Sequence, residues 1–168
     1  MLATLDFEAS GMRGYPIEVG VAIYDPGQPT IAVWSSLIRP PTDWLQTMSW
    51  DPVAAQIHGI APTSLKSAPA AFDVGRQLNA LLGPIGVAYC DGGRFDERWL
   101  YLLMQECPEP CLFELRDAGA LKDTLGIQPS GIFERDDAEP IAHRAGPDAE
   151  RLLRRALTLA GIPHDQSA

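Results

Sequence analysis

Residues 2–8 of the chain read Leu-Ala-Thr-Leu-Asp-Phe-Glu, an apolar run that carries two carboxylates two positions apart. The apolar residues around the acids favour a buried β-strand. In a strand the side chains of residues i and i+2 point to the same face, so Asp6 and Glu8 would lie side by side. Like charges placed in this way repel each other and destabilise the fold. The pair therefore requires a compensating partner.

Two further strands follow this first one. Apolar residues alternate with others over Ile17–Ile23, and the turn sequence "DPGQP" (25–29) leads to a third run over Ile31–Ile38. Such a short turn predicts that the third strand runs antiparallel to the second. We expect segment 39–50 to be a loop. Asp51-Pro52 is then typical of the N-cap and first residue of a short helix.

The second half of the chain alternates helical and strand patterns. Apolar residues three and four positions apart predict a helix over 71–82, a second one marked by apolar residues between 95 and 103, and a last helix that carries apolar residues from Ala149 to Ala160. A short helix is also expected near 117–124. Short apolar runs predict strands at 85–89 and 111–115, whereas polar residues 128–140 are expected to form a loop. The order of these elements predicts an α/β fold with a mixed sheet, antiparallel in its first three strands and parallel afterwards, with helices on both faces.

Composition indicates one acidic globular domain over residues 1–168, with a flexible tail from about residue 162. The chain is 46% hydrophobic and has 22 Asp and Glu against 13 Lys and Arg, a net charge of −9. This charge argues against a protein that coats long nucleic acids. Three cysteines make no disulfide framework, and no apolar run reaches the roughly 18–20 residues of a membrane span. Because a basic leader is also missing, we expect a cytoplasmic protein.

Three further polar residues lie where predicted helices begin. Asp96 follows the end of a buried strand, and Asp148 lies in the first turn of the last helix. His143 precedes Asp148 by five residues, which places it in the loop that leads into that helix. In open α/β sheets, sites gather at strand ends where helices begin. We therefore expect Asp96 and Asp148 to converge on the two acids of the first strand, and only bound cations would make this clustering favourable.

Three segments, "DFEASG" (6–11), "RFDERWL" (94–100) and "HRAGPDA" (143–149), resemble in order and separation the three motifs of the DEDDh exonucleases. The segments "YPIEVGVAIYD" and "IHGI" also lie where this family carries similar sequences. The family has the ribonuclease H-like fold and includes ribonuclease T, oligoribonuclease and polymerase proofreading subunits. The resemblance implies a metal-dependent 3′→5′ exonuclease that releases nucleoside 5′-monophosphates from single-stranded or short RNA or DNA 3′ ends. Dimers are common in the family, but the sequence does not fix the oligomeric state, so a homodimer stays one alternative.

The resemblance implies a role for each polar residue of the motifs. Asp6, Glu8, Asp96 and Asp148 would hold two divalent cations, Mg²⁺ or Mn²⁺, around the scissile phosphate. His143 would be the general base that takes a proton from the attacking water. The candidates for contact with the 3′-terminal nucleotides are Ser10, Gly11, Met12, Arg94, Arg144 and His58. Apart from the motifs, Glu18 could approach the site from the second strand, but we expect it to orient a backbone group or to face solvent.

The sequence departs from the family pattern at two places. Asp91-Gly92 stands where many members carry His-Asn, and Gly146 stands where Leu often follows "HRA". Neither change removes a ligand or the base, so we expect an active enzyme. The alternatives are a catalytically retired module that binds nucleic acid or protein, and a proofreading module of a polymerase assembly. The intact set of acids argues against a retired module, because clustered carboxylates are costly.

Overall fold

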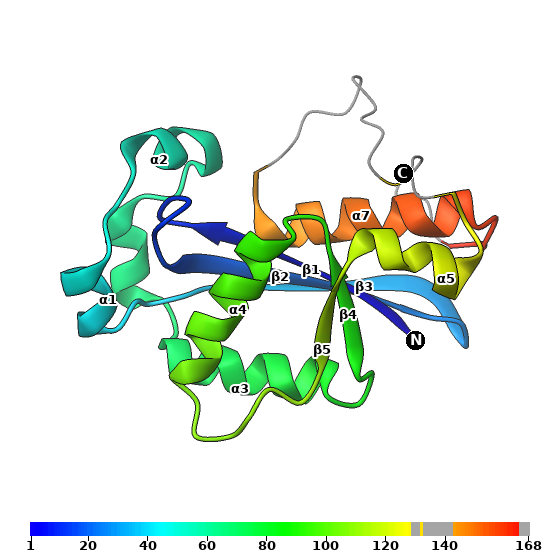
Figure 1. Cartoon of the computed structure of the whole chain (residues 1–168), viewed down its shortest axis with the longest axis horizontal. Helices are drawn as coiled ribbons and strands as arrows, with labels where there is room; N and C mark the ends of the chain where they lie inside the picture. The colour runs from blue at the N-terminus through cyan, green and yellow to red at the C-terminus, as the bar shows by residue number, and fades with distance from the viewer. Residues whose placement is uncertain (129–131, 133–142, 165–168) are drawn as a thin grey trace.

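The computed structural model describes residues 1–128, 132 and 143–164 (Figure 1). Its five strands are β1 (Leu2–Ala9), β2 (Pro16–Asp25), β3 (Gln28–Leu37), β4 (Val87–Cys90) and β5 (Glu114–Asp117). They form one sheet in the order β3-β2-β1-β4-β5. The pairs β1–β2 and β2–β3 are antiparallel, whereas β1–β4 and β4–β5 are parallel. The predicted mixed sheet is therefore confirmed.

Helices cover both faces of this sheet, as predicted. They are α1 (Thr42–Thr47), α2 (Pro52–His58), α3 (Ala71–Leu82), α4 (Arg94–Gln105), α5 (Leu121–Leu125) and α7 (Ala145–Leu159), with 3₁₀ turns η1 (Pro62–Ser67) and η2 (Ala118–Ala120). Figure 1 shows α7 running along one face of the sheet, while α3 and α4 lie on the opposite side. Within the described ranges, no helix combines the length and apolar character that a membrane crossing requires.

The alternation of β1 divides its side chains between two hydrophobic cores. Leu5 and Phe7 belong to the core that contains the apolar residues of α3 and α4, whereas Leu2 packs with α7. The Thr4 hydroxyl donates a hydrogen bond to the Ala149 carbonyl of α7 at 2.6 Å, which places the even-numbered residues on the α7 side. The acids at positions 6 and 8 share this face, as their spacing predicts.

Two glycines allow the first turn of α7 to lie against the sheet. A Cβ atom at Gly20 of β2 would lie 2.1 Å from the carbonyl carbon of Ala145, so a side chain there has no room. A Cβ at Gly146 would lie 3.1 Å from the Cβ of Ser35 on β3. The glycine that departs from the family pattern therefore faces a close neighbour on β3.

Two predicted elements differ in the structure. Segment 39–50, expected to be a loop, contains helix α1, whose buried Trp44 packs against Tyr15 with ring centroids 6.0 Å apart. The strand predicted at 111–115 begins later, at Glu114, because the preceding backbone pairs with a side chain. Asn79 donates from Nδ2 to the Pro110 carbonyl, and its Oδ1 accepts from the Leu112 amide, both at 2.9 Å.

The remaining predictions concern caps and chain ends. The Asp51 side chain accepts a hydrogen bond from the Val53 amide at 2.8 Å, which confirms the predicted N-cap of α2. Most of the predicted loop over 128–140 lies outside the described residues. Near the C-terminus, the Tyr24 hydroxyl donates to the carbonyl of Pro163, which lies in the tail predicted from about residue 162, at 3.0 Å. The rest of this tail, beyond residue 164, lies outside the described residues.

Candidate active site

The four predicted acids come together where β1, α4 and α7 meet. Asp6 and Glu8 lie on the C-terminal half of β1, at the centre of the sheet. Asp96 lies in the first turn of α4, which follows β4, the parallel neighbour of β1. Asp148 lies in the first turn of α7. Three distant segments thus deliver carboxylates to one end of β1, as the sequence predicts.

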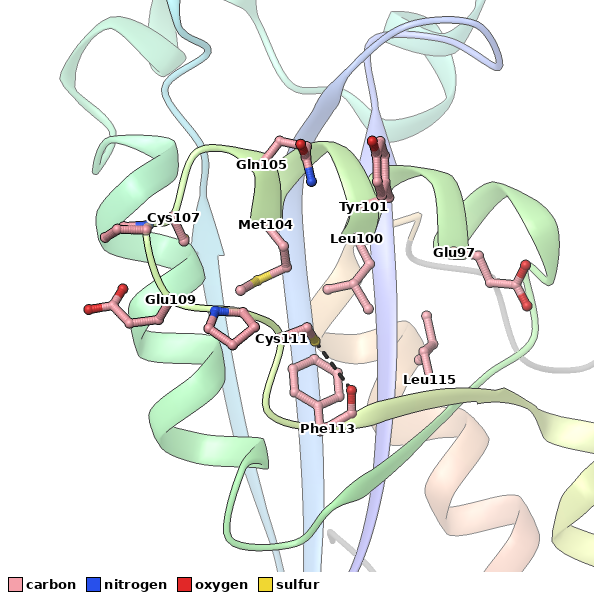
Figure 2. Close-up of a pocket in the computed structure, with 12 residues that line it drawn as sticks. Glu97, Leu100, Tyr101, Met104, Gln105, Cys107, Glu109, Cys111, Phe113 and Leu115 are labelled. Carbon is pink, nitrogen blue, oxygen red and sulfur yellow. Dashed lines mark hydrogen bonds between the residues drawn. The ribbon is translucent and has the colours of Figure 1, made fainter.

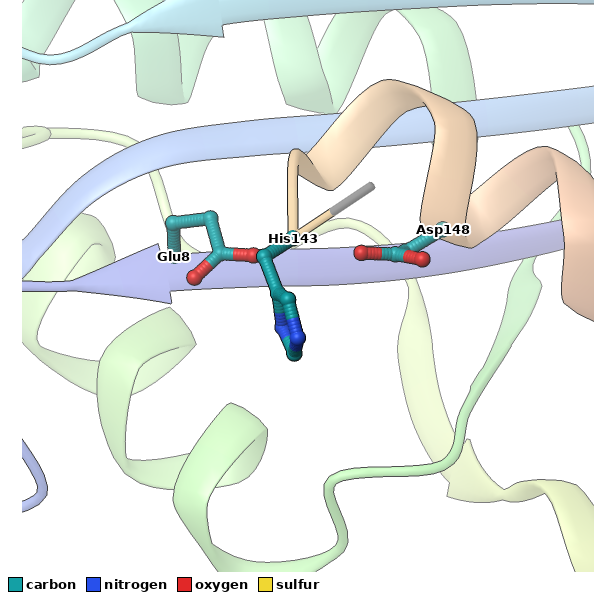
Figure 3. A group of neighbouring side chains, drawn as sticks. All are labelled: Glu8, His143 and Asp148. Atoms are coloured by element: carbon teal, nitrogen blue, oxygen red, sulfur yellow. The ribbon is translucent and has the colours of Figure 1, made fainter. Parts of the chain in front are cut away.

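The potential ligand atoms form two groups. One atom each of Glu8, His143 and Asp148 lie within 4.8 Å of one another. Figure 3 shows Glu8 near the end of its strand and Asp148 on α7, with His143 between them. The second group, with the same spacing, contains Asp6, Asp96 and Asp91. Asp91 thus joins the cluster from one of the two places where the sequence departs from the family.

Burial and mutual repulsion raise the pKa values of the clustered acids. Burial raises the pKa of Asp6 well above its usual range, and the charge of Asp96 adds to this rise. The pKa of Glu8 rises to about 7, mainly through burial and then through the charge of Asp148. The pKa of Asp96 also rises to about 7, through burial and then the charge of Asp91. The cluster therefore lacks enough compensating positive charge of its own.

Gly92 shapes the position of Asp96. Its amide donates to Oδ2 of Asp96 at 3.0 Å, and a Cβ at this glycine would lie 2.5 Å from the same oxygen. An asparagine at position 92, as in many DEDDh members, would displace the carboxylate from this place. The departure at Asp91-Gly92 therefore both adds an acid to the cluster and leaves room for Asp96.

The chain enters α7 in an unusual conformation. His143 has φ 46°, in the left-handed region that residues with side chains rarely adopt. The next amide, of Arg144, donates to Oδ2 of Asp148 at 3.2 Å, and Nη2 of Arg151 donates to Oδ1 at 3.1 Å. Backbone geometry of this kind persists only where the surroundings hold it, and it is common at functional sites.

Glu18 of β2 is part of this arrangement. It pairs directly with Glu8 in the β1–β2 register and is only 2% exposed, so the expectation that it faces solvent is wrong. Its Oε2 accepts from the Ala145 amide at 3.1 Å, which confirms the alternative that it orients a backbone group. It also bonds both Nε and Nη2 of Arg144, at 2.9 and 2.6 Å. The alternation of β2 indicated the face on which Glu18 lies, but no local sequence pattern identified Arg144 as its partner.

The candidate nucleotide-binding loop follows β1. Ser10 is buried, and its hydroxyl accepts from the Tyr15 amide at 3.0 Å and donates to the Ser49 carbonyl at 3.2 Å. Gly11 has φ 149°, and Met12 is 67% exposed. Ser10 thus shapes the loop, while Met12 presents an apolar side chain to solvent.

Sequence reasoning missed Arg98 of α4, whose side chain reaches the loop after β1. Its guanidinium donates to the carbonyls of Gly14 at 3.0 Å, Arg13 at 3.1 Å and Met12 at 3.3 Å. These contacts tie the loop after β1 to the helix that carries Asp96. Because the partners are backbone carbonyls, no motif in the sequence could indicate them.

The last two candidates differ in exposure. Arg94 is exposed at the first residue of α4. His58 is buried, and its Nδ1 accepts from the Ile60 amide at 3.0 Å, whereas Nε2 has no partner among the described residues. Its ring lies edge-on to Trp50, with centroids 5.9 Å apart, and burial lowers its pKa.

A separate groove of about 590 Å³ lies between α4 and the segment that leads into β5. Figure 2 shows Leu100 and Met104 of α4 pointing toward Phe113 across this groove. Its lining contains none of the clustered acids or His143. The groove is therefore not the candidate active site.

The sheet order, with acids gathered at the end of its central strand, defines an α/β protein of the ribonuclease H-like fold found in exonucleases. Exonuclease X, solved with a 5′ overhanging duplex DNA, matches with a TM-score of 0.60 and 21% identity, over 96% of this chain and 93% of that one. A 3′-exonuclease that recognises the histone mRNA stem-loop matches with a TM-score of 0.68 and 15% identity, over 95% and 63%.

Exonuclease I of E. coli, in complex with a dA16 oligonucleotide, matches with a TM-score of 0.63 and 16% identity. The match covers 94% of this chain but only 41% of exonuclease I, so this chain corresponds to a part of that longer protein. No family model matches the sequence, and no curated protein matches it. The structural neighbours are exonucleases, in agreement with the resemblance of the three motifs, and at these identities they establish the fold.

Proposed function

We propose that the protein is a metal-dependent 3′→5′ exonuclease that releases nucleoside 5′-monophosphates from single-stranded or short 3′ ends. One observation carries this proposal, namely the convergence of four acids and His143 from three distant segments at the end of β1. Buried carboxylates are costly unless something compensates their charge. Their gathering on a fold that exonucleases share supports a catalytic role.

The donor set suits divalent cations. Carboxylate oxygens are the ligands that Mg²⁺ and Mn²⁺ prefer. The raised pKa values of Glu8 and Asp96, both about 7, support a site whose missing positive charge a cation supplies. The proposed ligands of two cations are Asp6, Glu8, Asp96 and Asp148. When bound, such cations lower the pKa of a water molecule and neutralise charge at the scissile phosphate.

His143 is the proposed general base. Its ring lies with the carboxylates of Glu8 and Asp148, and an imidazole can accept a proton near neutral pH. It would take the proton of the water that attacks phosphorus. The bond between phosphorus and the 3′ oxygen then breaks, so the released nucleotide keeps its 5′-phosphate and the shortened strand ends in a 3′-hydroxyl.

The substrate contacts proposed from the motifs lie around this centre. The Ser10 amide already donates to the Tyr15 carbonyl at 2.9 Å, so Ser10 acts through the shape of the loop. The candidates for holding the 3′-terminal nucleotide are the Gly11 amide, the exposed Met12 and His58. Arg94 and Arg144 are the candidates for phosphate contacts, and the Arg144 side chain is 47% exposed although it pairs with Glu18. The sequence has 13 Lys and Arg against 22 Asp and Glu, which favours a site that engages only the last nucleotides of a strand.

The direct test follows short RNA and DNA strands labelled at the 5′ end during incubation with Mn²⁺ or Mg²⁺. The proposal predicts a ladder that shortens from the 3′ end by one nucleotide at a time. Asp148→Asn and Asp96→Asn should each remove most of this activity while the protein stays folded. Internal cuts, full activity in excess chelator, or binding without any product would contradict the proposal, and the last result would favour a retired binding module.

A further inference from the structure

We infer that Glu18 is a positioning residue that holds His143 in place through Arg144. The inference rests on the proposed function and adds a residue outside the four acids and the base. Glu18 lies on β2, directly across from Glu8. Unless a cationic group pairs with the Glu18 carboxylate, its charge would mainly repel Glu8. Its contacts show where that charge is used.

Both carboxylate oxygens of Glu18 hold the entry to α7. Oε1 accepts from Nη2 of Arg144 at 2.6 Å, and Oε2 accepts from Nε of the same side chain at 2.9 Å. Oε2 also accepts from the Ala145 amide at 3.1 Å. Two parallel hydrogen bonds between a carboxylate and a guanidinium fix the relative orientation of the two groups as well as the distance between them. One side chain of β2 thus fixes the two residues that follow His143.

The residue with the strained backbone, His143, lies directly before these two held residues. His143 has φ 46°, and the Arg144 amide at the next position donates to Asp148. The Ala145 backbone also rests on Gly20, which lies on the same face of β2 as Glu18. The segment is therefore fixed from β2 at two points, and the bidentate pair is the contact that can set the direction of His143.

This arrangement differs from an ordinary stabilising ion pair on the same helix. Glu150 and Arg154 also form an ion pair on α7, at 2.6 Å, but their side chains are 28% and 24% exposed. The Glu18 side chain is only 3% exposed. The Arg144 side chain is 47% exposed, so the guanidinium keeps part of its contact with water while the carboxylate is buried. Burying a carboxylate costs free energy that one ion pair offsets only in part, so we expect this pair to contribute mainly to the geometry of the segment.

The test is a double-mutant cycle between Glu18→Gln and His143→Ala. Glutamine keeps the shape of the side chain but loses the charge and the bidentate acceptor. Because small misplacement of a catalytic group is costly, Glu18→Gln should lower kcat by about 10- to 100-fold, with KM little changed. In the His143→Ala background the same change should cost less than about threefold. Glu150→Gln, which removes the more exposed ion pair of α7, is the matched control with unchanged kcat.

A second measurement does not depend on activity. Ring-proton NMR signals of His143, assigned with His143→Ala, should be single and sharp in the native protein and broadened or doubled in Glu18→Gln. The signals of His164, which lies outside the site, should not change. An unchanged His143 signal, or equal losses of kcat in both backgrounds, would overturn the inference. If the native protein showed no nuclease activity, the proposed function would fail, while the NMR result would still decide whether Glu18 positions His143.

Discussion

At the scale of single residues, the acids of the site differ in which groups compensate their negative charge. Asp148 accepts from the Arg144 amide and from Arg151, and Asp96 accepts from the Gly92 amide. Glu8 faces Glu18, whose charge adds to the rise in the pKa of Glu8. The site is thus a patch of negative charge that the fold compensates only in part.

The raised pKa values predict how stability depends on pH without metal. Glu8 and Asp96 have pKa values of about 7 in the folded protein, against ordinary values of 4.5 and 3.8. The folded state therefore binds more protons than the unfolded state across this window, and the free energy of unfolding should fall as pH rises from about 4 to 7. Thermal melting in chelator should show this fall, and Glu8→Gln should reduce its slope.

Added Mn²⁺ should raise the melting temperature most at pH 8, where the carboxylates are ionised and ready to bind. Glu109→Gln, a change outside the cluster, is the matched control for Glu8→Gln and should keep the native dependence of stability on pH. A flat profile in chelator, or equal slopes for Glu8→Gln and the native protein, would contradict the assigned pKa values.

His143→Ala tests the proposed base. Loss of a general base should lower kcat by about 10²- to 10⁴-fold. Binding of Mn²⁺, measured by calorimetric titration, should survive because the four carboxylates remain. His164→Ala, a histidine near the C-terminal end of the described chain, is the control that should leave the rate unchanged. A near-native rate for His143→Ala would reduce His143 to a loop residue.

At the scale of elements, the sequence predicted the sheet and the start of α2 because local patterns specify them. The alternation in β1 and β2, and the Asp51-Pro52 start of α2, are such patterns. Helix α1 was missed because a segment of only six residues carries too little periodicity. The four acids and His143 were predicted from motifs, but the Glu18–Arg144 contact depends on how α7 packs on β2, which no local pattern records.

Gly20→Ala tests the packing of α7 on β2. A Cβ there would lie 2.1 Å from the Ala145 carbonyl carbon, and backbone cannot yield without moving the start of α7. Overpacking of this kind should cost about 1–3 kcal/mol of stability, measured by urea denaturation, and should lower activity as well. Gly27→Ala is the control, because a Cβ in that turn would meet only Asp25 at 3.4 Å. Native stability for Gly20→Ala would contradict the close approach of α7.

At the scale of the whole molecule, the net charge of −9 limits how much nucleic acid the protein can hold. Several arginines near the site already have partners. Arg144 bonds Glu18, Arg151 bonds Asp148, and Arg98 bonds backbone carbonyls of the loop after β1. Few side chains are left to neutralise phosphates along a strand, so the grip on substrate should be short.

Substrate length and salt test this consequence. Oligonucleotides of a few residues should be degraded about as well as long single strands, and blunt duplexes poorly. Because few phosphates are contacted, the rate should depend only weakly on salt. Arg94→Ala should raise KM with little effect on kcat, and Arg155→Ala on α7 is a comparison outside the motifs. A strong preference for long strands with a steep salt dependence would indicate an extended basic track instead.

The most direct measurement of the central claim is the mass of the first product released from a trinucleotide in water enriched in ¹⁸O, with Mn²⁺ present. A 3′→5′ exonuclease that uses water as nucleophile should release the 3′-terminal nucleoside 5′-monophosphate with one ¹⁸O on its phosphate, and Asp6→Asn or excess chelator should prevent release. A nucleoside without phosphate as the first product, a monophosphate without ¹⁸O, or unchanged release in chelator would contradict the claim.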